Sequence, residues 1–321
     1  MMRMTWLRAA QSCAMTLLLG TVALAGAPLL KTQAPGYYRM MLGDFEVTAL
    51  SDGTFPMNAA RLLTHITPEA LEQDLRRSFL TDPIEESVNG FLINTGTHLV
   101  LIDTGAGSVF APSTGKLLQS LEASGYRPEQ VDEIYITHMH PDHIGGLVAN
   151  GARVFPNATV RAAREEADYW LSQSRMAAAP AAARQRFAQA MQAIDPYRAA
   201  GKFETFSGDV ELVPGIRAIA APGHTPGHTL YRAQSKDQVM LFWGDVVHVA
   251  AAQFPDPSVT IHFDSDSAQA AAERQKVFAE VAEHRDWIAG AHLSFPGIGH
   301  LRANGPGYTF VHANYTSLSL P

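Results

Sequence analysis

The chain is almost free of cysteine, because Cys13 is the only one among 321 residues. Cys13 lies in an N-terminal segment that has two arginines, then an apolar run, then the small-residue end ALA at 23–25. This order is typical of a secretory signal that is removed by cleavage. We therefore expect residues 1–25 to be a signal peptide. The mature protein would then have no cysteine and would be stabilised without disulfide bonds.

The chain also lacks an apolar run long enough for a membrane anchor, which needs about 20 residues. Gln11, Ser12 and Thr16 interrupt the N-terminal run. We expect an exported protein, periplasmic or secreted, with no stable anchor after cleavage. A flexible connector at 26–36 and a single domain at 37–321 would follow the signal.

Clusters of lysine or arginine are absent as well. The whole chain has a formal charge of −7, and removal of residues 1–25 leaves 22 basic against 31 acidic residues. Because phosphate backbones need a clustered basic face, nucleic acid is excluded as a partner. There is also no GxSxG segment, so the sequence gives no support to a serine nucleophile of the α/β-hydrolase type.

The sequence does contain the stretch THMHPDHIGG at 137–146. It follows VDEIYIT at 131–137, a pattern that predicts a strand. In an extended segment His138 and His140 point the same way, whereas Asp142 and His143 lie beyond a proline turn and can face a second point. Imidazole and carboxylate groups without thiolate suit zinc, and also manganese, cobalt or iron. We expect a metal site here.

Three further polar residues follow strand-like runs in the second half of the chain. They are His224 in PGHTPGH, Asp245 in WGD and His292 in AHLS. An isolated histidine is more often structural than a metal ligand, so each of these residues alone is a weak signal. Strand-like runs lie at 45–50, 91–94, 99–103, 210–213, 216–220, 229–232, 239–243 and 287–291, and helical patterns at 114–124, 163–172, 176–200 and 267–284. Two β-rich halves flanked by helices predict a four-layer αββα sandwich.

HxHxDH with GG, then GHTPGH, GD and a late histidine, together resemble the metallo-β-lactamase superfamily over nearly the whole mature chain. The resemblance implies an αββα sandwich with a dinuclear metal site, two divalent ions that are zinc in the first instance, and a hydroxide between them as nucleophile. It assigns His138, His140 and His224 to one ion, and Asp142, His143 and His292 to the other. Asp245 would bridge the ions, Asp103 would orient the site, and His228 and His300 would not be ligands.

Longer segments resemble the methyl parathion hydrolase group, which includes dihydrocoumarin-hydrolysing lactonases. They are APGYYRMMLGDFEVTALSDGT, VDEIYITHMHPDH, DPSVTIHFDSDS and HLSFPGIGH. This resemblance implies an exported homodimer that cleaves small aryl lactones, aryl esters or phosphotriesters.

By the same resemblance, aromatic residues hold the leaving group and other residues complete the pocket. The aromatic set is Phe110, Trp170 and Phe187, and the others are Leu62, His248, Ile261 and Phe263. Core packing is the alternative for the aromatic set. Phosphotriesterases of the group have a basic residue in place of Leu62 and an aliphatic one in place of His248, so this sequence favours an aryl lactonase or arylesterase.

The alternatives are a dedicated phosphotriesterase, an acyl-homoserine lactonase and a non-catalytic metal-binding protein. A β-lactamase is disfavoured because those zinc enzymes generally lack the bridging aspartate. A glyoxalase-type thioesterase is disfavoured because no C-terminal basic cluster is present to bind glutathione.

Overall fold

The computed structural model describes residues 27–110 and 112–315, so the expected signal peptide lies outside the described residues. The described residues from 35 onward form one compact unit. Residues 27–36, where a connector is expected, contain no helix or strand. Within the described ranges, no helix is both long and apolar enough to cross a membrane.

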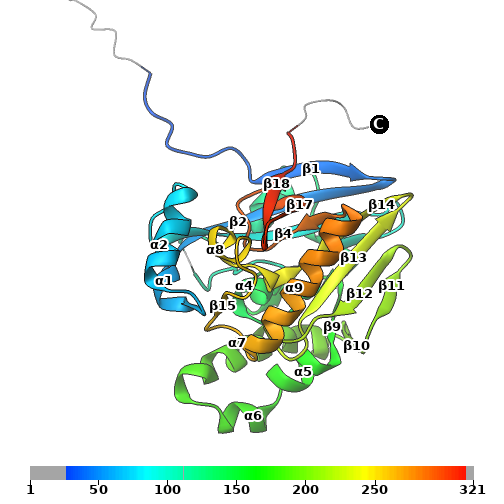
Figure 1. Ribbon diagram of the computed structural model, residues 1–321. Helices are drawn as coiled ribbons and strands as arrows, with labels where there is room; N and C mark the ends of the chain where they lie inside the picture. Colours follow the sequence, from blue (N-terminus) through cyan, green and yellow to red (C-terminus); the bar gives the residue numbers. More distant parts are fainter. Residues whose placement is uncertain (1–26, 111, 316–321) are drawn as a thin grey trace, which may run out of the picture. The chain divides into compact units, whose positions relative to one another are not determined.

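Two seven-stranded sheets form the centre of this unit (Figure 1). The first has the order β1-β2-β4-β5-β6-β9-β10, and the second β11-β12-β13-β14-β16-β17-β18. The first sheet consists of β1 (Tyr37–Leu42), β2 (Phe45–Met57), β4 (Ile84–Asn94), β5 (Leu99–Ile102), β6 (Glu133–Tyr135), β9 (Thr159–Ala163) and β10 (Phe203–Phe206). The second consists of β11 (Val210–Val213), β12 (Ile216–Ala220), β13 (Thr229–Ser235), β14 (Gln238–Phe242), β16 (Trp287–Ala289), β17 (Ile298–Asn304) and β18 (Gly307–His312).

Helices and short two-stranded ribbons complete the fold. The helices are α1 (Ala59–Leu62), α2 (Pro68–Arg77), α3 (Leu117–Ala123), α4 (Pro141–Ile144), α5 (Arg164–Trp170), α6 (Gln173–Ala178), α7 (Ala181–Ala199), α8 (Ala250–Gln253) and α9 (Ser267–His284). Single 3-10 turns are η1 (Pro128–Gln130), η2 (Gly145–Leu147) and η3 (Gly244–Val246). The ribbons pair β3 (Leu63–Thr64) with β15 (Thr260–Ile261), and β7 (Val148–Ala149) with β8 (Ala152–Arg153).

The alternation of apolar residues along the strands produces the layers. In β5, Leu101 packs in the core shared with α3, α5 and α7, whereas Val100 packs between the two sheets. In β14, Met240 lies between the sheets and Leu241 packs in the core shared with α9. Successive strand residues point to opposite faces, so each sheet buries both faces. The predicted αββα sandwich is confirmed.

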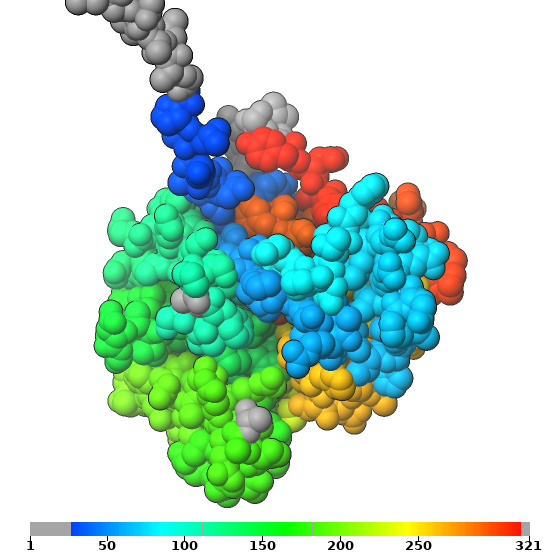
Figure 2. All heavy atoms as spheres, turned by 90° about the vertical axis from the view of Figure 1, so that its left-hand side faces the viewer, coloured from blue at the N-terminus to red at the C-terminus, as the bar shows by residue number. Residues whose placement is uncertain are grey.

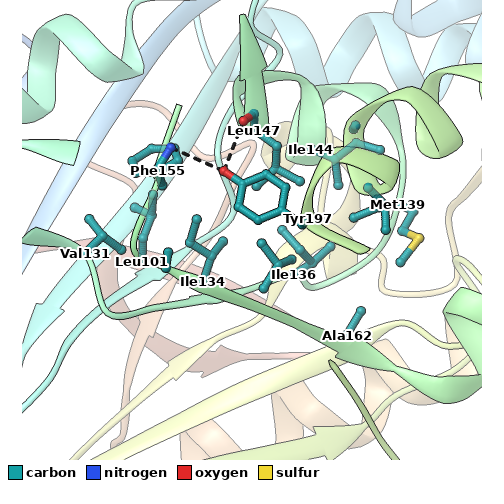
Figure 3. Close-up of a cluster of buried hydrophobic side chains, with 14 of the residues drawn as sticks. Leu101, Val131, Ile134, Ile136, Met139, Ile144, Leu147, Phe155, Ala162 and Tyr197 are labelled. Atoms are coloured by element: carbon teal, nitrogen blue, oxygen red, sulfur yellow. Dashed lines mark hydrogen bonds between the residues drawn. The ribbon is translucent and has the colours of Figure 1, made fainter. Parts of the chain in front are cut away.

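Tyr197 of α7 anchors that helix beneath the histidine-rich loop, which is residues 136–147 between β6 and β7 (Figure 3). Its hydroxyl group donates to the carbonyl of Leu147 at 3.1 Å and accepts from the N–H of Phe155 at 3.2 Å. Apolar side chains from the same loop, including Ile136 and Met139, surround it. The loop is therefore supported from behind by a packed core.

The predicted elements agree with the structure in type and differ in some of their bounds. The expected strands at 210–213 and 216–220 and the helix at 267–284 match, and the side chain of Asp266 caps α9 by accepting from the N–H of Gln269. The expected helix at 176–200 is wrong as one element. It is two helices, α6 and α7, because Pro180 has no N–H group and disfavours helical backbone in the residue before it.

Candidate metal centre

Four strands, one from the first sheet and three from the second, end in loops whose polar side chains lie close together. β6 leads into the loop with residues 138–143, and β12 leads into the loop with His224. β14 and β16, which run parallel, end just before Asp245 and His292. Since parallel strands end at the same sheet edge, the side chains that follow them lie close together.

The first group of candidate ligands contains three buried imidazoles and one carboxylate. Nε2 of His224 lies 3.2 Å from Nε2 of His138 and 3.1 Å from Nδ1 of His140. Oδ2 of Asp245 lies 3.2 Å from Nε2 of His224 and 3.4 Å from Nε2 of His138. The four ligand atoms all lie within 4.8 Å of one another.

The second group adjoins the first through Asp245. Oδ2 of Asp142 lies 3.8 Å from Nε2 of His143 and 3.5 Å from Nε2 of His292. Oδ1 of Asp245 lies 3.0 Å and 3.3 Å from the same two nitrogens. One oxygen of Asp245 therefore faces each group, which is the arrangement expected of a bridging carboxylate.

The donor set fits two divalent cations. His143 Nε2 and Asp245 Oδ1 are buried and have no hydrogen-bond partner among the described residues. Buried polar atoms that face one another unpaired are costly, and a cation at each centre would satisfy them. Nitrogen and carboxylate oxygen donors suit zinc and its first-row neighbours.

Electrostatics around Asp245 keep it in the carboxylate form. Burial raises its pKa, but the surrounding imidazoles, above all His143 and His292, hold it well below the usual range. Burial and neighbouring histidines lower the pKa of His138 and of His140 well below the ordinary value. These two rings are therefore neutral, the form in which imidazole coordinates a metal.

In three candidate ligand histidines, the ring N–H that points away from the other ligands donates a hydrogen bond to a carboxylate or a backbone carbonyl. Nδ1–H of His143 donates to Asp103 at 2.8 Å, and Asp103 also accepts from the backbone and hydroxyl of Thr137 at 2.8 Å and 2.7 Å. Nδ1–H of His224 donates to Asp264 at 2.9 Å, and that of His292 donates to the carbonyl of Ser87 at 2.8 Å. Such partners fix the tautomer and turn the other nitrogen towards the centre.

Asp103 thus lies where the resemblance put it, whereas Asp264 was missed. Asp264 follows no glycine-rich turn and belongs to no spaced histidine motif. Only the quoted segment DPSVTIHFDSDS pointed to its neighbourhood.

Glu166 and His228 do not belong to the ligand groups, but both accept hydrogen bonds from the backbone of segments that carry candidate ligands. Glu166 accepts from the N–H groups of Met139 at 2.8 Å and Gly227 at 2.9 Å, and so joins the two histidine loops. His228 accepts from the N–H of Asp245 at 3.1 Å. His300 lies elsewhere, with its Nδ1–H donating to the carbonyl of Asp286 at 3.0 Å.

Arg274 of α9 holds two loops near the site. Its buried guanidinium donates to the carbonyls of Val246 at 2.6 Å, Pro257 at 3.0 Å and Val259 at 2.7 Å. Burial lowers the pKa of Arg274 to about 10, so the group stays charged at neutral pH. The loop that carries Asp245 and the segment that leads to Asp264 are thereby tied to one helix.

A cavity of about 390 Å³ opens onto the candidate ligands. Three of the seven expected pocket residues line it, namely Phe110, His248 and Phe263. The rest of its wall and floor consists of Phe55, Met57, Glu86, Val109, His140, Pro141, Asp142, Gln185, Arg186, Gln189, Asp245 and His292. Segments of α1–α2, of α7 and of residues 250–270 meet on one face of the molecule (Figure 2).

The other four expected pocket residues do not line this cavity and pack in apolar cores, so their part in a substrate pocket stays a prediction. Trp170 and Phe187 lie in the core between the first sheet and its helices, with ring centroids 4.8 Å apart, because both side chains point inward from α5 and α7. Trp170 still touches the site, since its ring packs edge-on against His140 at 5.4 Å. Leu62 and Ile261 pack in the small core beneath α1 and α2.

His248 lies directly beside two of the candidate ligands. Its Nε2 is 3.0 Å from Oδ2 of Asp245, and its ring stacks on His292 at 5.1 Å. It therefore forms part of the cavity floor.

Comparisons with known proteins agree with this geometry. The Metallo-beta-lactamase superfamily model matches residues 83–283. A crystal structure of AbOPH, a hydrolase in the beta lactamase superfamily, is 37% identical and superposes with a TM-score of 0.85 over 89% of this chain and 100% of that one. AidC, a dizinc quorum-quenching lactonase solved with the product N-hexanoyl-L-homoserine, is 28% identical, with a TM-score of 0.81 over 88% of this chain and 99% of that one.

A curated relative, an N-acyl homoserine lactonase from Bacillus cereus, is 30% identical over 162 residues. That match covers 50% of this chain and 56% of the relative, so the chain spans little more than half the length of that relative. The family model covers well over half of the chain, and the solved hydrolase covers most of it. The chain belongs to the metallo-beta-lactamase superfamily.

Proposed function

We propose that this protein is a metal-dependent hydrolase of small lactones and activated esters, with aryl lactones of the dihydrocoumarin type as the first candidates. The observation that carries the proposal is the cavity of about 390 Å³, whose floor contains His140, Asp142, Asp245 and His292 and whose wall contains Phe55 and Phe110. A cavity of this size accommodates a small bicyclic lactone.

In this proposal seven residues hold two divalent ions, zinc first and manganese, cobalt or iron as alternatives. They are His138, His140, Asp142, His143, His224, Asp245 and His292. Bound ions would supply a Lewis acid for the substrate oxygen and would lower the pKa of water enough to give a nucleophile at neutral pH.

The other residues bind and orient. Asp103, Asp264 and the carbonyl of Ser87 fix the imidazole rings, so the centre is preorganised before substrate binds. The rings of Phe55 and Phe110, with centroids 5.1 Å apart, offer an aromatic face to a phenolic leaving group. His248 narrows the cavity floor on the side of Asp245.

Acyl-homoserine lactones are the second candidate class. Their support is the likeness of this chain to two other proteins. One is an N-acyl homoserine lactonase and the other is AidC, a quorum-quenching lactonase. Phosphotriesters come third, because the imidazole of His248 occupies room beside Asp245 that a dialkyl phosphate would need.

The test is kcat/KM of one zinc-loaded preparation for dihydrocoumarin, for N-hexanoyl-homoserine lactone and for methyl parathion. We expect dihydrocoumarin to exceed methyl parathion by a hundredfold or more, which corresponds to about 2.7 kcal/mol of transition-state preference. The reverse ratio would make the protein a phosphotriesterase. A higher value for the acyl-homoserine lactone would replace the aryl class by the acyl class.

A further inference from the structure

A buried carboxyl group without a partner lines the cavity. Glu86 of β4 is 2% exposed, yet it lies in the cavity wall. Its Oε1 atom has no hydrogen-bond partner among the described residues. The nearest basic group is Nδ1 of His292 at 3.7 Å, and that nitrogen already donates to the carbonyl of Ser87 at 2.8 Å.

Such a group is costly to the folded protein. Most buried polar atoms in native structures are paired, and an unpaired one loses its hydration without compensation. Burial also raises the pKa of Glu86 well above the usual range. Whether protonated or ionised, the carboxyl group keeps at least one oxygen that accepts a hydrogen bond.

Glu86 lies beside the candidate ligand His292 but is not itself a candidate ligand. None of the candidate metal groups includes it. In the pairing of β2 with β4, Glu86 lies directly opposite Phe55, whose ring lines the same cavity. A carboxyl group and an aromatic ring are thus placed side by side in the wall, next to the floor where the scissile bond would lie.

We propose that Glu86 determines specificity by accepting a hydrogen bond from an N–H or O–H group on the substrate. The preferred substrates are then lactones with a donor next to the scissile carbonyl, such as a hydroxyl or acylamino group. This inference rests on the proposed lactonase function and narrows its substrate class. A site built to pair with a substrate donor discriminates strongly against an analogue that lacks it, because the protein group stays unpaired.

The test uses two matched substrate pairs that differ in a single donor. One pair is 3-hydroxydihydrocoumarin and its 3-methoxy ether, and the other is N-hexanoyl-homoserine lactone and its N-methyl amide. For the zinc-loaded wild type we expect kcat/KM to be at least tenfold higher for the donor-bearing member of at least one pair.

Substitution of Glu86 should abolish that preference. In Glu86→Leu, and in Glu86→Met as a second apolar variant, the ratio should fall to about one because the rate for the donor-bearing substrate falls. Glu86→Gln keeps an accepting oxygen and should keep part of the ratio. Glu85→Leu is the matched control, since Glu85 is the exposed neighbour on the other face of β4 and should leave the ratio unchanged.

Zinc content and thermal unfolding provide a readout independent of turnover. The apolar variants should keep the wild-type zinc content and unfold at the same or a higher temperature, because an unpaired carboxyl group has been removed. Three results would overturn the inference and give Glu86 a structural role. They are loss of zinc, a lower unfolding temperature in both apolar variants, and an equal fall in kcat/KM for both members of a pair. A wild-type ratio near one in both pairs would also overturn it. No turnover of any lactone by the wild type would overturn the proposed function itself.

Discussion

At the scale of single residues, a few side chains that never reach the centre of the site fix the ones that do. Asp103, Asp264, Glu166 and His228 each pair with a backbone or side-chain group of a loop that carries a candidate ligand. The side chain of each is buried, so each pairing matters more than it would in water.

Glu166→Gln tests whether the carboxylate that links the two histidine loops matters for stability and metal binding. The amide offers one acceptor where the carboxylate offers two, so the N–H group of either Met139 or Gly227 loses its partner. We expect unfolding in urea to show a loss of about 1–3 kcal/mol, together with weaker zinc binding. Glu165→Gln, at the exposed neighbouring position, should change neither quantity. A stable Glu166 variant with wild-type zinc affinity would show that the loops do not need this joint.

Phe110→Ala tests the aromatic wall of the cavity. Phe110 is 38% exposed and packs against Phe55 at the cavity. Because an aromatic contact adds about 0.5–1.5 kcal/mol beyond its buried area, kcat/KM for dihydrocoumarin should fall about 2–10-fold more than for δ-valerolactone. The control is Phe79→Ala, since Phe79 is 96% exposed and lies outside the cavity lining. Equal losses on both lactones would remove Phe110 from leaving-group recognition.

At the scale of secondary-structure elements, two helices hold the loops in place from opposite layers. α7 supports the histidine-rich loop through Tyr197, and α9 supports the loops near Asp245 and Asp264 through Arg274. Both helices belong to the outer layers of the sandwich (Figure 1).

Tyr197→Phe should loosen the support by α7. The change leaves the carbonyl of Leu147 and the N–H of Phe155 without their partner in a packed core. We expect a loss of about 1–3 kcal/mol in chemical unfolding. Tyr315→Phe serves as the control because Tyr315 is exposed. An unchanged stability would mean that water reaches both groups and replaces the hydroxyl.

Arg274→Met should weaken zinc binding although Arg274 is not a candidate ligand. Without the guanidinium, three buried carbonyls lose a donor and the segments with Val246 and Val259 are no longer tied to α9. Outer-shell partners of this kind typically change metal affinity about 10–100-fold. Competition with a chelator measures the change, with Arg302→Met as an exposed control. Unaltered affinity would show that the loops are fixed by other contacts.

The sequence predicted most strongly what depends on local pattern. The strands at 210–213 and 216–220 and the helix at 267–284 follow from alternation, periodicity and an N-cap. Helix α2 was missed, although Thr67 followed by Pro68 and Glu69 is a helix-start signal that was available. One helix was expected at 176–200, but Pro180 separates α6 from α7.

In the candidate site too, local motifs were predictable from the sequence and contacts between distant segments were not. The seven candidate ligands lie in motifs that a single sequence shows, and the structure brings all seven together. Glu86, Asp264 and Arg274 could not be found this way, because their importance comes from contacts between segments far apart in the chain. Trp170 and Phe187 were expected to line the pocket, but the inward faces of α5 and α7 place them in the core.

At the scale of the whole molecule, two sheets and the loops between them meet at one buried polar cluster. That cluster sits among apolar cores, with candidate ligands from both halves of the chain. Cations bound there would therefore link the two halves, and only the folded chain would offer all seven groups.

Metal removal should then lower global stability. A ligand that binds only the folded state stabilises it by about 4 kcal/mol at a thousandfold excess over Kd. We expect the midpoint of thermal unfolding to fall on treatment with a chelator and to recover with zinc, measured by calorimetry. Unfolding at the same temperature with and without metal would contradict a site shared by both halves.

Export and homodimerisation remain predictions, which signal-cleavage mapping and sedimentation would check.

The proposed lactone hydrolysis requires two metal ions bound at this site. This requirement is tested most directly by adding zinc in steps to metal-free protein and following the initial rate of dihydrocoumarin hydrolysis. We predict no hydrolysis without zinc and a rate that stops rising at two zinc ions per chain. Hydrolysis without metal, saturation at one ion, or no hydrolysis at two would contradict the account.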